Sequence, residues 1–579
     1  MPSATRRLLF VSVAAAIAIP AIAQVQNNAA PQAQSRAPAA QSQTATQTVP
    51  VAETETVVEQ QVAAEPPPPP IEYPSYARRD AFTAGALDPV AIGLGAQPWG
   101  DASGVFLSGL MRRMSTPLAS RWAHIALRDA LLAAAHSPRG VNPVDWAAER
   151  AWLLLRMGEA DAARMVVASV DTDRYTPKMA QVAVQSALAS SDPLALCGFP
   201  GQVRHSDPRA FPLVEAMCSA LNGEPETAAD QIDSARRRGS VGGIDLGLAQ
   251  KIVGAAGDSA RSVTIEWEPV DALTAWRYGL STAAAMSPPD RLMDSAPARV
   301  RAWYARAPLI SFEDRLQSAR IATGLGVFSS QALTDFYSAV YDSTDSNDLG
   351  GTDAWQLRLA FAGRDQETRL AAMRRLWDVG DGSLQLEASR AMLGRASARL
   401  VPSPDIQSDA PNIVASMLAA GMDKEAATWA DAAGRMDDQY SDRVWSMLAL
   451  AAPEGAAIDL GVGRINEFIR RDQSSGRKRS ALLVAGLAAL GKLDAAAASR
   501  LNARYRLHIE RTSPWTQMID AAARREQAGS VLVLAGTGLQ AGGFNAVPSA
   551  HLFHIVMALR NTGQDFTARM IAAEALSRT

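Results

Sequence analysis

From about residue 80 to the C-terminus, apolar residues recur at the spacing of amphipathic helices. One stripe would lie on a single helix face and is formed by Trp146, Leu153, Leu154 and Met157. Asn142 and Pro143 precede this stripe, and an Asn N-cap followed by a proline at the first helical position is a common helix start. No comparable set of alternating strand patterns occurs, so the sequence predicts an all-α fold.

The order of helix, glycine turn and helix repeats along the chain. After Gly158, apolar residues return at the i, i+3, i+4 and i+7 positions of a second helix, which are Ala163, Val166, Val167 and Val170. Further stripes end at Gly491 and at Gly563. A series of helix pairs can bury its apolar faces by stacking. The pattern therefore predicts stacked antiparallel helical hairpins, in which each hairpin contacts mainly its neighbours.

Six glycines can be aligned at the predicted turns, namely Gly158, Gly223, Gly363, Gly421, Gly491 and Gly563. An alanine stands five positions after all of them except Gly363, which is followed by Thr368; these alanines are Ala163, Ala228, Ala426, Ala496 and Ala568. Two closely packed antiparallel helices need a small residue where they cross. We therefore predict that these five alanines lie at helix crossings.

This pattern resembles the tetratricopeptide repeat, a family with a glycine at the turn between its two helices and small alanines five and twelve residues beyond it. The aromatic residues of the family's first helix and its closing proline are not regularly present here, so the resemblance is to a degenerate array. It implies an α-solenoid that offers a surface to protein or peptide partners, and it implies no reaction.

Prolines interrupt the repeats near the middle of the chain. Pro288 and Pro289 are followed by Pro297 and Pro308, and each proline removes a helical hydrogen-bond donor and ends the preceding helix. We therefore divide the predicted solenoid into an N-terminal array over residues 80–290 and a C-terminal array over residues 291–579.

The N-terminal residues have the pattern of a secretory signal. Arg6 and Arg7 precede an apolar run over residues 8–22, and small residues end that run. We predict that residues 1–23 are a signal peptide cleaved before Gln24, and that the protein is exported to the periplasm or another part of the cell envelope. An uncleaved membrane anchor is the alternative. No later stretch is long and apolar enough to predict a membrane span after cleavage.

Residues 24–79 differ in composition from the rest of the chain. They are rich in Ala, Gln, Thr, Val and Pro, and they include a run of five prolines at residues 66–70. Few large apolar residues are present that could offset the entropy of ordering. The sequence therefore predicts a disordered linker with a polyproline end. This linker is interpreted as a spacer, and recognition by a proline-binding partner is the alternative.

Charge and cysteine content narrow the choice of partners and compartment. The formal net charge is −3 and the arginines are spread along the chain, so no nucleic-acid footprint is predicted. Cys197 and Cys218 are the two cysteines. In an oxidising compartment they are expected to form a disulfide, and two separate buried thiols are the alternative.

Three segments imitate motifs that carry chemistry. Gly536, Gly538 and Ala541 have the spacing of a dinucleotide-binding loop, but more glycines and a proline follow where a helix should begin, which favours a helix that ends in a loop. His551 and His554 share a helix face without further zinc ligands. The acidic loop around residue 345 lacks the calcium ligands of an EF-hand. The sequence therefore indicates no catalytic residue, no cofactor and no metal.

These observations favour a non-catalytic protein-binding or scaffold protein of the cell envelope. The protein or peptide partner and the oligomeric state are not identified by the sequence. Two alternatives remain open. One is an enzyme or enzyme subunit that acts on an envelope polymer through an unrecognised site, and the other is a purely structural surface protein.

Overall fold

The computed structural model describes residues 74–239, 241–256, 263–379 and 384–579. Within these ranges the regular structure consists of α-helices and short 3₁₀-helices, with two isolated β-bridges and no strand. The predicted all-α fold is therefore confirmed for the described part of the chain. The predicted signal peptide and residues 24–73 of the predicted linker lie outside the described residues.

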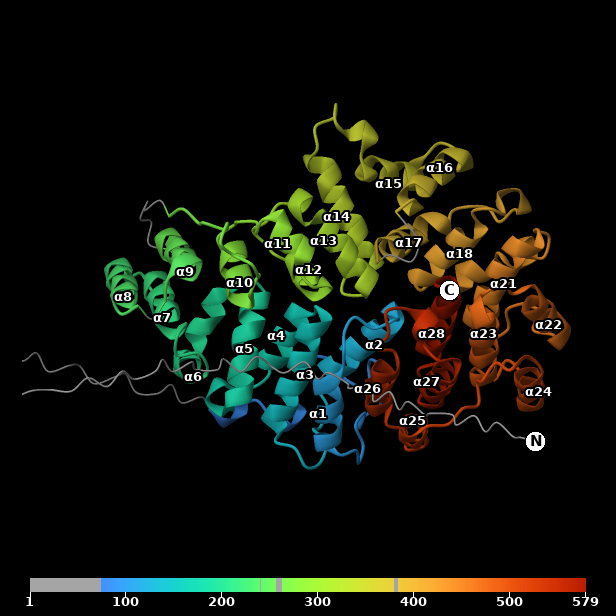
Figure 1. Ribbon diagram of the computed structural model, residues 1–579, viewed down its shortest axis with the longest axis horizontal. Helices are drawn as coiled ribbons and strands as arrows, with labels where there is room; N and C mark the ends of the chain where they lie inside the picture. Colours follow the sequence, from blue (N-terminus) through green and yellow to red (C-terminus); the bar gives the residue numbers. More distant parts are fainter. Residues whose placement is uncertain (1–73, 240, 257–262, 380–383) are drawn as a thin grey trace, which may run out of the picture. The chain divides into compact units, whose positions relative to one another are not determined.

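The helices are best followed in three groups (Figure 1). Before residue 257 they are α1 (Gly104–Arg113), α2 (Arg121–Leu132), α3 (Pro143–Met157), α4 (Ala160–Ala168), α5 (Pro177–Ala189), α6 (Pro200–Ser206), α7 (Phe211–Leu221), α8 (Pro225–Arg237) and α9 (Gly243–Ala256). Between residues 263 and 379 they are α10 (Ala275–Ala283), α11 (Asp290–Ser295), α12 (Ala298–Tyr304), α13 (Phe312–Leu325), α14 (Ser330–Ser343), α15 (Asp353–Ala362) and α16 (Gln366–Trp377).

The third group runs from residue 384 to the C-terminus. It comprises α17 (Leu384–Ser397), α18 (Ala410–Ala419), α19 (Asp423–Ala427), α20 (Ala430–Ala433), α21 (Asp438–Ala451), α22 (Val462–Arg471), α23 (Lys478–Ala489), α24 (Ala495–Tyr505), α25 (Pro514–Arg524), α26 (Ala528–Gly538), α27 (Ser549–Asn561) and α28 (Asp565–Ser577). None of the described helices has the length and apolarity needed to cross a bilayer.

Capping residues set the ends of the helices in the pattern expected from the sequence. The Asn142 side chain accepts hydrogen bonds from the backbone N–H groups of Val144 and Asp145 at the start of α3. Gly158 ends α3 in the left-handed region with φ of 93°. The other turn glycines also have positive φ, except Gly363, whose φ is −54°. The chain therefore leaves α15 in an extended conformation, without the left-handed turn.

Four of the five predicted crossing alanines are fully buried. Ala163, Ala228, Ala426 and Ala568 are each 0% exposed. Each is the fourth residue of a helix that begins two positions after its turn glycine, in α4, α8, α19 and α28. They face the packed interior at equivalent places in their helices.

The prediction for the fifth alanine, Ala496, is wrong. Ala496 is exposed, because three residues separate Gly491 from the start of α24 where the other hairpins have one. The longer turn shifts the helix register relative to the glycine. The fourth residue of α24 is Ala498, which is 4% exposed and takes the place that the sequence assigned to Ala496.

Adjacent helices pack in pairs, and the pairs stack on one another. Paired neighbours include α3 with α4, α7 with α8, α15 with α16, α17 with α18 and α27 with α28. Stacking contacts skip one helix, as in α3 with α5, α7 with α9 and α25 with α27. This arrangement is that of many stacked helices and is consistent with a helical repeat architecture.

The chain also makes contacts that a linear array of hairpins does not predict. Helix α2 packs against α26 and α28, and α1 packs against α26 (Figure 1). Leu127 of α2 lies against Gly536 of α26, where a Cβ atom would come within 3.0 Å of the leucine side chain. Residues 73–579 accordingly form one compact unit, which contains both predicted arrays.

A buried polar cluster holds this junction together. The Glu574 carboxylate of α28 accepts hydrogen bonds from the backbone N–H of Arg121 at 2.8 Å and from the Ser120 hydroxyl, and so caps the N-terminus of α2. The Arg121 guanidinium donates to the carbonyls of Thr323 and Ala419, both at 2.9 Å. One arginine therefore satisfies the C-terminal ends of α13 and α18 while its own helix is capped by α28.

Residues 74–79 are part of the described structure, although the sequence assigned them to the disordered linker. Ser75–Ala77 form a 3₁₀-helix, and Arg78 forms an ion pair with Asp173. The backbone N–H of Arg79 donates to the Asp171 carboxylate at 3.2 Å. These contacts attach the stretch to the segment that follows α4. The predicted linker boundary at residue 79 is therefore too late.

Candidate functional site

A groove of about 360 Å³ lies between α3, α5, α12 and the start of α10. Its large apolar lining residues are Trp152, Leu155, Leu273, Val300 and Trp303. Such a concentration of large apolar and aromatic side chains around a hollow is typical of binding sites. These helices lie next to one another in the green part of the ribbon (Figure 1).

Helix α3 supplies one wall of the groove because it is apolar on more than one face. Its interior face carries the stripe expected from the sequence, which includes Trp146 and Leu154. Trp152, Leu155 and Arg156 stand at i, i+3 and i+4 and form the groove-lining face. Trp152 remains 37% exposed, so the described chain leaves a large aromatic surface open on this face.

Helix α12 forms the opposite wall of the groove, and the α3–α4 turn packs closely against it. A Cβ atom at Gly158 would lie 2.8 Å from the Cβ of Ala302, so a glycine at the turn allows α12 to approach. The Trp303 ring packs against the ring of Tyr278, with 5.8 Å between the ring centroids. Trp303 is 8% exposed and is held in place from behind by α10.

Two arginines are the only charged residues among those that line the groove. Arg156 donates to the carbonyls of Met111 and Met114, which caps the end of α1. Burial lowers the pKa of Arg156, the Glu149 charge raises it, and the nearby Arg299 charge lowers it again. Burial also lowers the pKa of Arg299. The groove is therefore electropositive and apolar.

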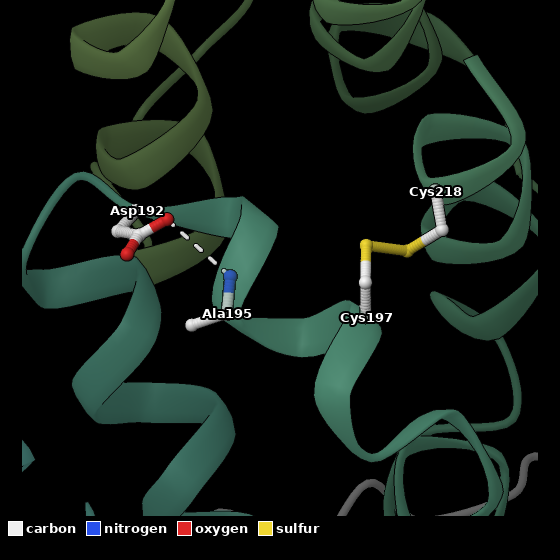
Figure 2. Close-up of a disulfide and its surroundings, with 4 residues drawn as sticks. All are labelled: Asp192, Ala195, Cys197 and Cys218. Carbon is white, nitrogen blue, oxygen red and sulfur yellow. Dashed lines mark hydrogen bonds between the residues drawn. A yellow bond between two sulfur atoms is a disulfide. The ribbon is translucent and has the colours of Figure 1, made fainter. Parts of the chain in front are cut away.

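The two cysteines lie apart from this groove and form a disulfide. Cys197 belongs to the 3₁₀-helix Pro193–Gly198 and Cys218 belongs to α7, with 5.6 Å between their Cα atoms. Figure 2 shows the bond joining the two segments, with the Asp192 side chain accepting a hydrogen bond from the backbone N–H of Ala195 at 3.3 Å. The disulfide fastens the loop after α5 to the following hairpin.

The segment that imitates a dinucleotide-binding loop is a helix. Residues 528–538 form α26, and the interpretation as a helix that ends in a loop is confirmed. Gly536 lies against Leu127 and Met114, and Gly538 lies against Trp515. These glycines allow close packing of helices, and they stand at the C-terminal end of α26, whereas a phosphate-binding loop has its glycines at a helix N-terminus.

The histidines singled out in the sequence have structural partners. His554 Nδ1 lies 2.8 Å from the Asp520 carboxylate, and His551 Nδ1 lies 3.3 Å from the carbonyl of Gly538. In the acidic loop, the Asp345 carboxylate accepts a hydrogen bond from the backbone N–H of Asn347. Across the described ranges, no group of three or more His, Cys, Asp or Glu side chains is arranged to hold a metal ion.

Sequence reasoning missed the groove. Trp152, Arg299 and Trp303 come from helices separated by more than 140 residues, so no local motif joins them. A usable signal was present within α3, where a second apolar stripe follows Trp152 on a face other than that of Trp146. A helix with apolar residues on two faces has a second surface to cover.

The chain matches no protein-family model, no curated protein and no solved structure. The resemblance to the tetratricopeptide repeat therefore rests on the turn glycines and the alanines that follow them. The groove is identified by its own geometry and chemistry, without a residue role transferred from a relative.

Proposed function

We propose that this protein is a non-catalytic binding or scaffold protein of the cell envelope. In this proposal the chain is exported with residues 1–23 as its signal peptide, and a tetratricopeptide-like helical surface binds a protein or peptide partner. The observation that carries the proposal is the groove between α3 and α12, where Trp152 is 37% exposed within an apolar lining. Exposed tryptophans beside apolar pockets are enriched at protein interfaces.

The chemistry of the groove supports binding over turnover. Its polar lining residues are Arg156, Gln185, Thr274 and Arg299, and the Thr274 hydroxyl accepts the capping hydrogen bond from the backbone N–H of Arg277. These residues supply hydrogen-bond donors, and they include no carboxylate or histidine that could serve as a general base. An enzyme that acts on an envelope polymer and a purely structural surface protein are the competing functions.

The export part of the proposal rests on the N-terminal signal pattern and on the disulfide. A disulfide between Cys197 and Cys218 is stable in an oxidising compartment such as the periplasm. N-terminal sequencing of the mature protein from its native cell tests this part. A start at or near Gln24 would support export, and an intact Met1 in the membrane fraction would indicate an anchor.

Site-specific photocrosslinking tests the binding function. A photoreactive amino acid in place of Trp152 should capture one reproducible protein in intact native cells. The matched control is the same substitution at Val401, which is 67% exposed and lies outside the groove. Equal adducts from both positions, or none from Trp152, would reject the groove as a partner site. Turnover of an envelope glycan or peptide by the purified protein would favour the enzymatic alternative.

A further inference from the structure

Residues that line the groove have N–H donors that the described part of the chain leaves without acceptors. The indole Nε1 of Trp303 and the Nε of Arg156 are both buried and both lack a hydrogen-bond partner. The Arg299 guanidinium has no ion pair and no hydrogen bond within the described ranges, and burial lowers its pKa. Unmatched buried donors are costly, and two of them belong to residues that line this groove. The exposed Arg299 adds a positive charge without a partner beside them.

Charge in the groove has the same sign throughout. No Asp or Glu is among the residues that line it, while Arg156 and Arg299 are close enough to repel each other. Helix α10 begins at the same place, with Thr274 as its N-cap, and a helix N-terminus adds further positive potential. A ligand that brings a carboxylate would pair with the Arg299 guanidinium and reduce the repulsion between the two arginines.

We propose that the groove binds a protein segment in which an acidic side chain lies next to a large apolar side chain. This inference rests on the proposed function. The carboxylate would pair with Arg299, whose planar guanidinium can donate two parallel hydrogen bonds. The apolar side chain would pack on Trp152 and Val300, which border the same space.

Two features favour a protein segment over a small molecule. Small-molecule sites cover most of the ligand surface, but here Trp152 is 37% exposed and Arg299 is exposed. A chain segment needs only one side of its length covered. Arg156 has a supporting role, because its terminal nitrogens already donate to the carbonyls at the end of α1 and its Nε alone remains open.

A pair of synthetic peptides tests the inference on the purified full-length chain. Both are acetylated and amidated and have a central Leu-Glu-Leu or Leu-Gln-Leu sequence, and binding is measured by fluorescence polarisation of an attached dye. We expect the Glu peptide to bind about tenfold more tightly than the Gln peptide, as expected for a charge-assisted hydrogen bond. Arg299→Gln should remove this difference by weakening the Glu peptide alone. The matched control, Arg113→Gln at an exposed position of α1, should preserve the difference.

Each alternative outcome would overturn the inference. Equal binding of the two peptides, or no binding of the Glu peptide at about 1 mM, excludes recognition of an acidic side chain. Tighter binding of a Gln peptide with a free C-terminal carboxylate than of the amidated Glu peptide would assign the site to chain termini. Capture of a partner at Trp152 together with any of these results would leave the proposed function standing and remove only the inference about acidic segments.

Discussion

Arg121 and Arg299 differ in whether the protein itself supplies hydrogen-bond acceptors for their guanidinium groups. At the junction of α2, Arg121 donates to three backbone carbonyls and has Glu574 beside it, although burial lowers its pKa. In the groove, Arg299 has no partner among the described residues. Arg121 stabilises the fold through hydrogen bonds to its own chain, whereas the donors of Arg299 are available to a ligand.

The largest effect is expected from removing the satisfied arginine. Arg121→Ala removes the donor to three backbone carbonyls at this junction, whereas Glu574 keeps its ion pair with Arg578. Because each unsatisfied buried carbonyl is costly, the change should lower the free energy of unfolding by about 3–5 kcal/mol. Arg299→Ala should change it by less than about 0.5 kcal/mol. Urea denaturation followed by circular dichroism measures both. A large loss from Arg299→Ala would show that this arginine is structural, and the comparison would fail.

The disulfide allows the α2–α28 junction to be compared with the hairpin of α7 and α8, which lies outside that junction. Its loop spans 21 residues, so Cys218→Ala should lower the free energy of unfolding by about 3 kcal/mol in the chain-entropy model. Hydrogen exchange should quicken in α6, α7 and α8 and stay unchanged in α2 and α28. The wild-type protein in reductant is the control and should show the same pattern. No response to reductant would argue for two separate thiols.

Local features of this fold were accessible from the sequence, and long-range features were not. Asn142 and Gly158 mark the ends of α3 through capping chemistry that acts within a few residues. The Ser120–Glu574 hydrogen bond joins residues 454 positions apart, and neither residue stands in a pattern that identifies the other. A repeat pattern predicts contacts between neighbouring hairpins, and it does not predict contacts between distant helices such as α2 and α28.

The groove could not be predicted from the sequence because its walls are far apart along the chain. The wrong prediction for Ala496 has a different cause. Each wall of the groove is an ordinary helix, and the absence of acids near Arg299 becomes visible only when α3 and α12 are brought together. For Ala496, counting from the glycine assumes a constant turn length. Asp494 caps α24 two residues later than that count requires, so the small-residue position moved with the helix.

The smallest expected change in stability concerns two alanines in α24 and follows from this register shift. Ala498→Leu adds three carbon atoms to a packed contact and should lower the free energy of unfolding by about 1–3 kcal/mol. Ala496→Leu places the same atoms in solvent, so its effect should be under about 0.5 kcal/mol. Both changes keep helix-forming residues in α24, so helix propensity is nearly matched between the variants. Urea denaturation of the two proteins under identical conditions measures the difference. A larger loss of stability from Ala496→Leu than from Ala498→Leu would contradict this register. It would mean that Ala496 is the packed residue and that the turn after Gly491 is as short as the turns of the other hairpins.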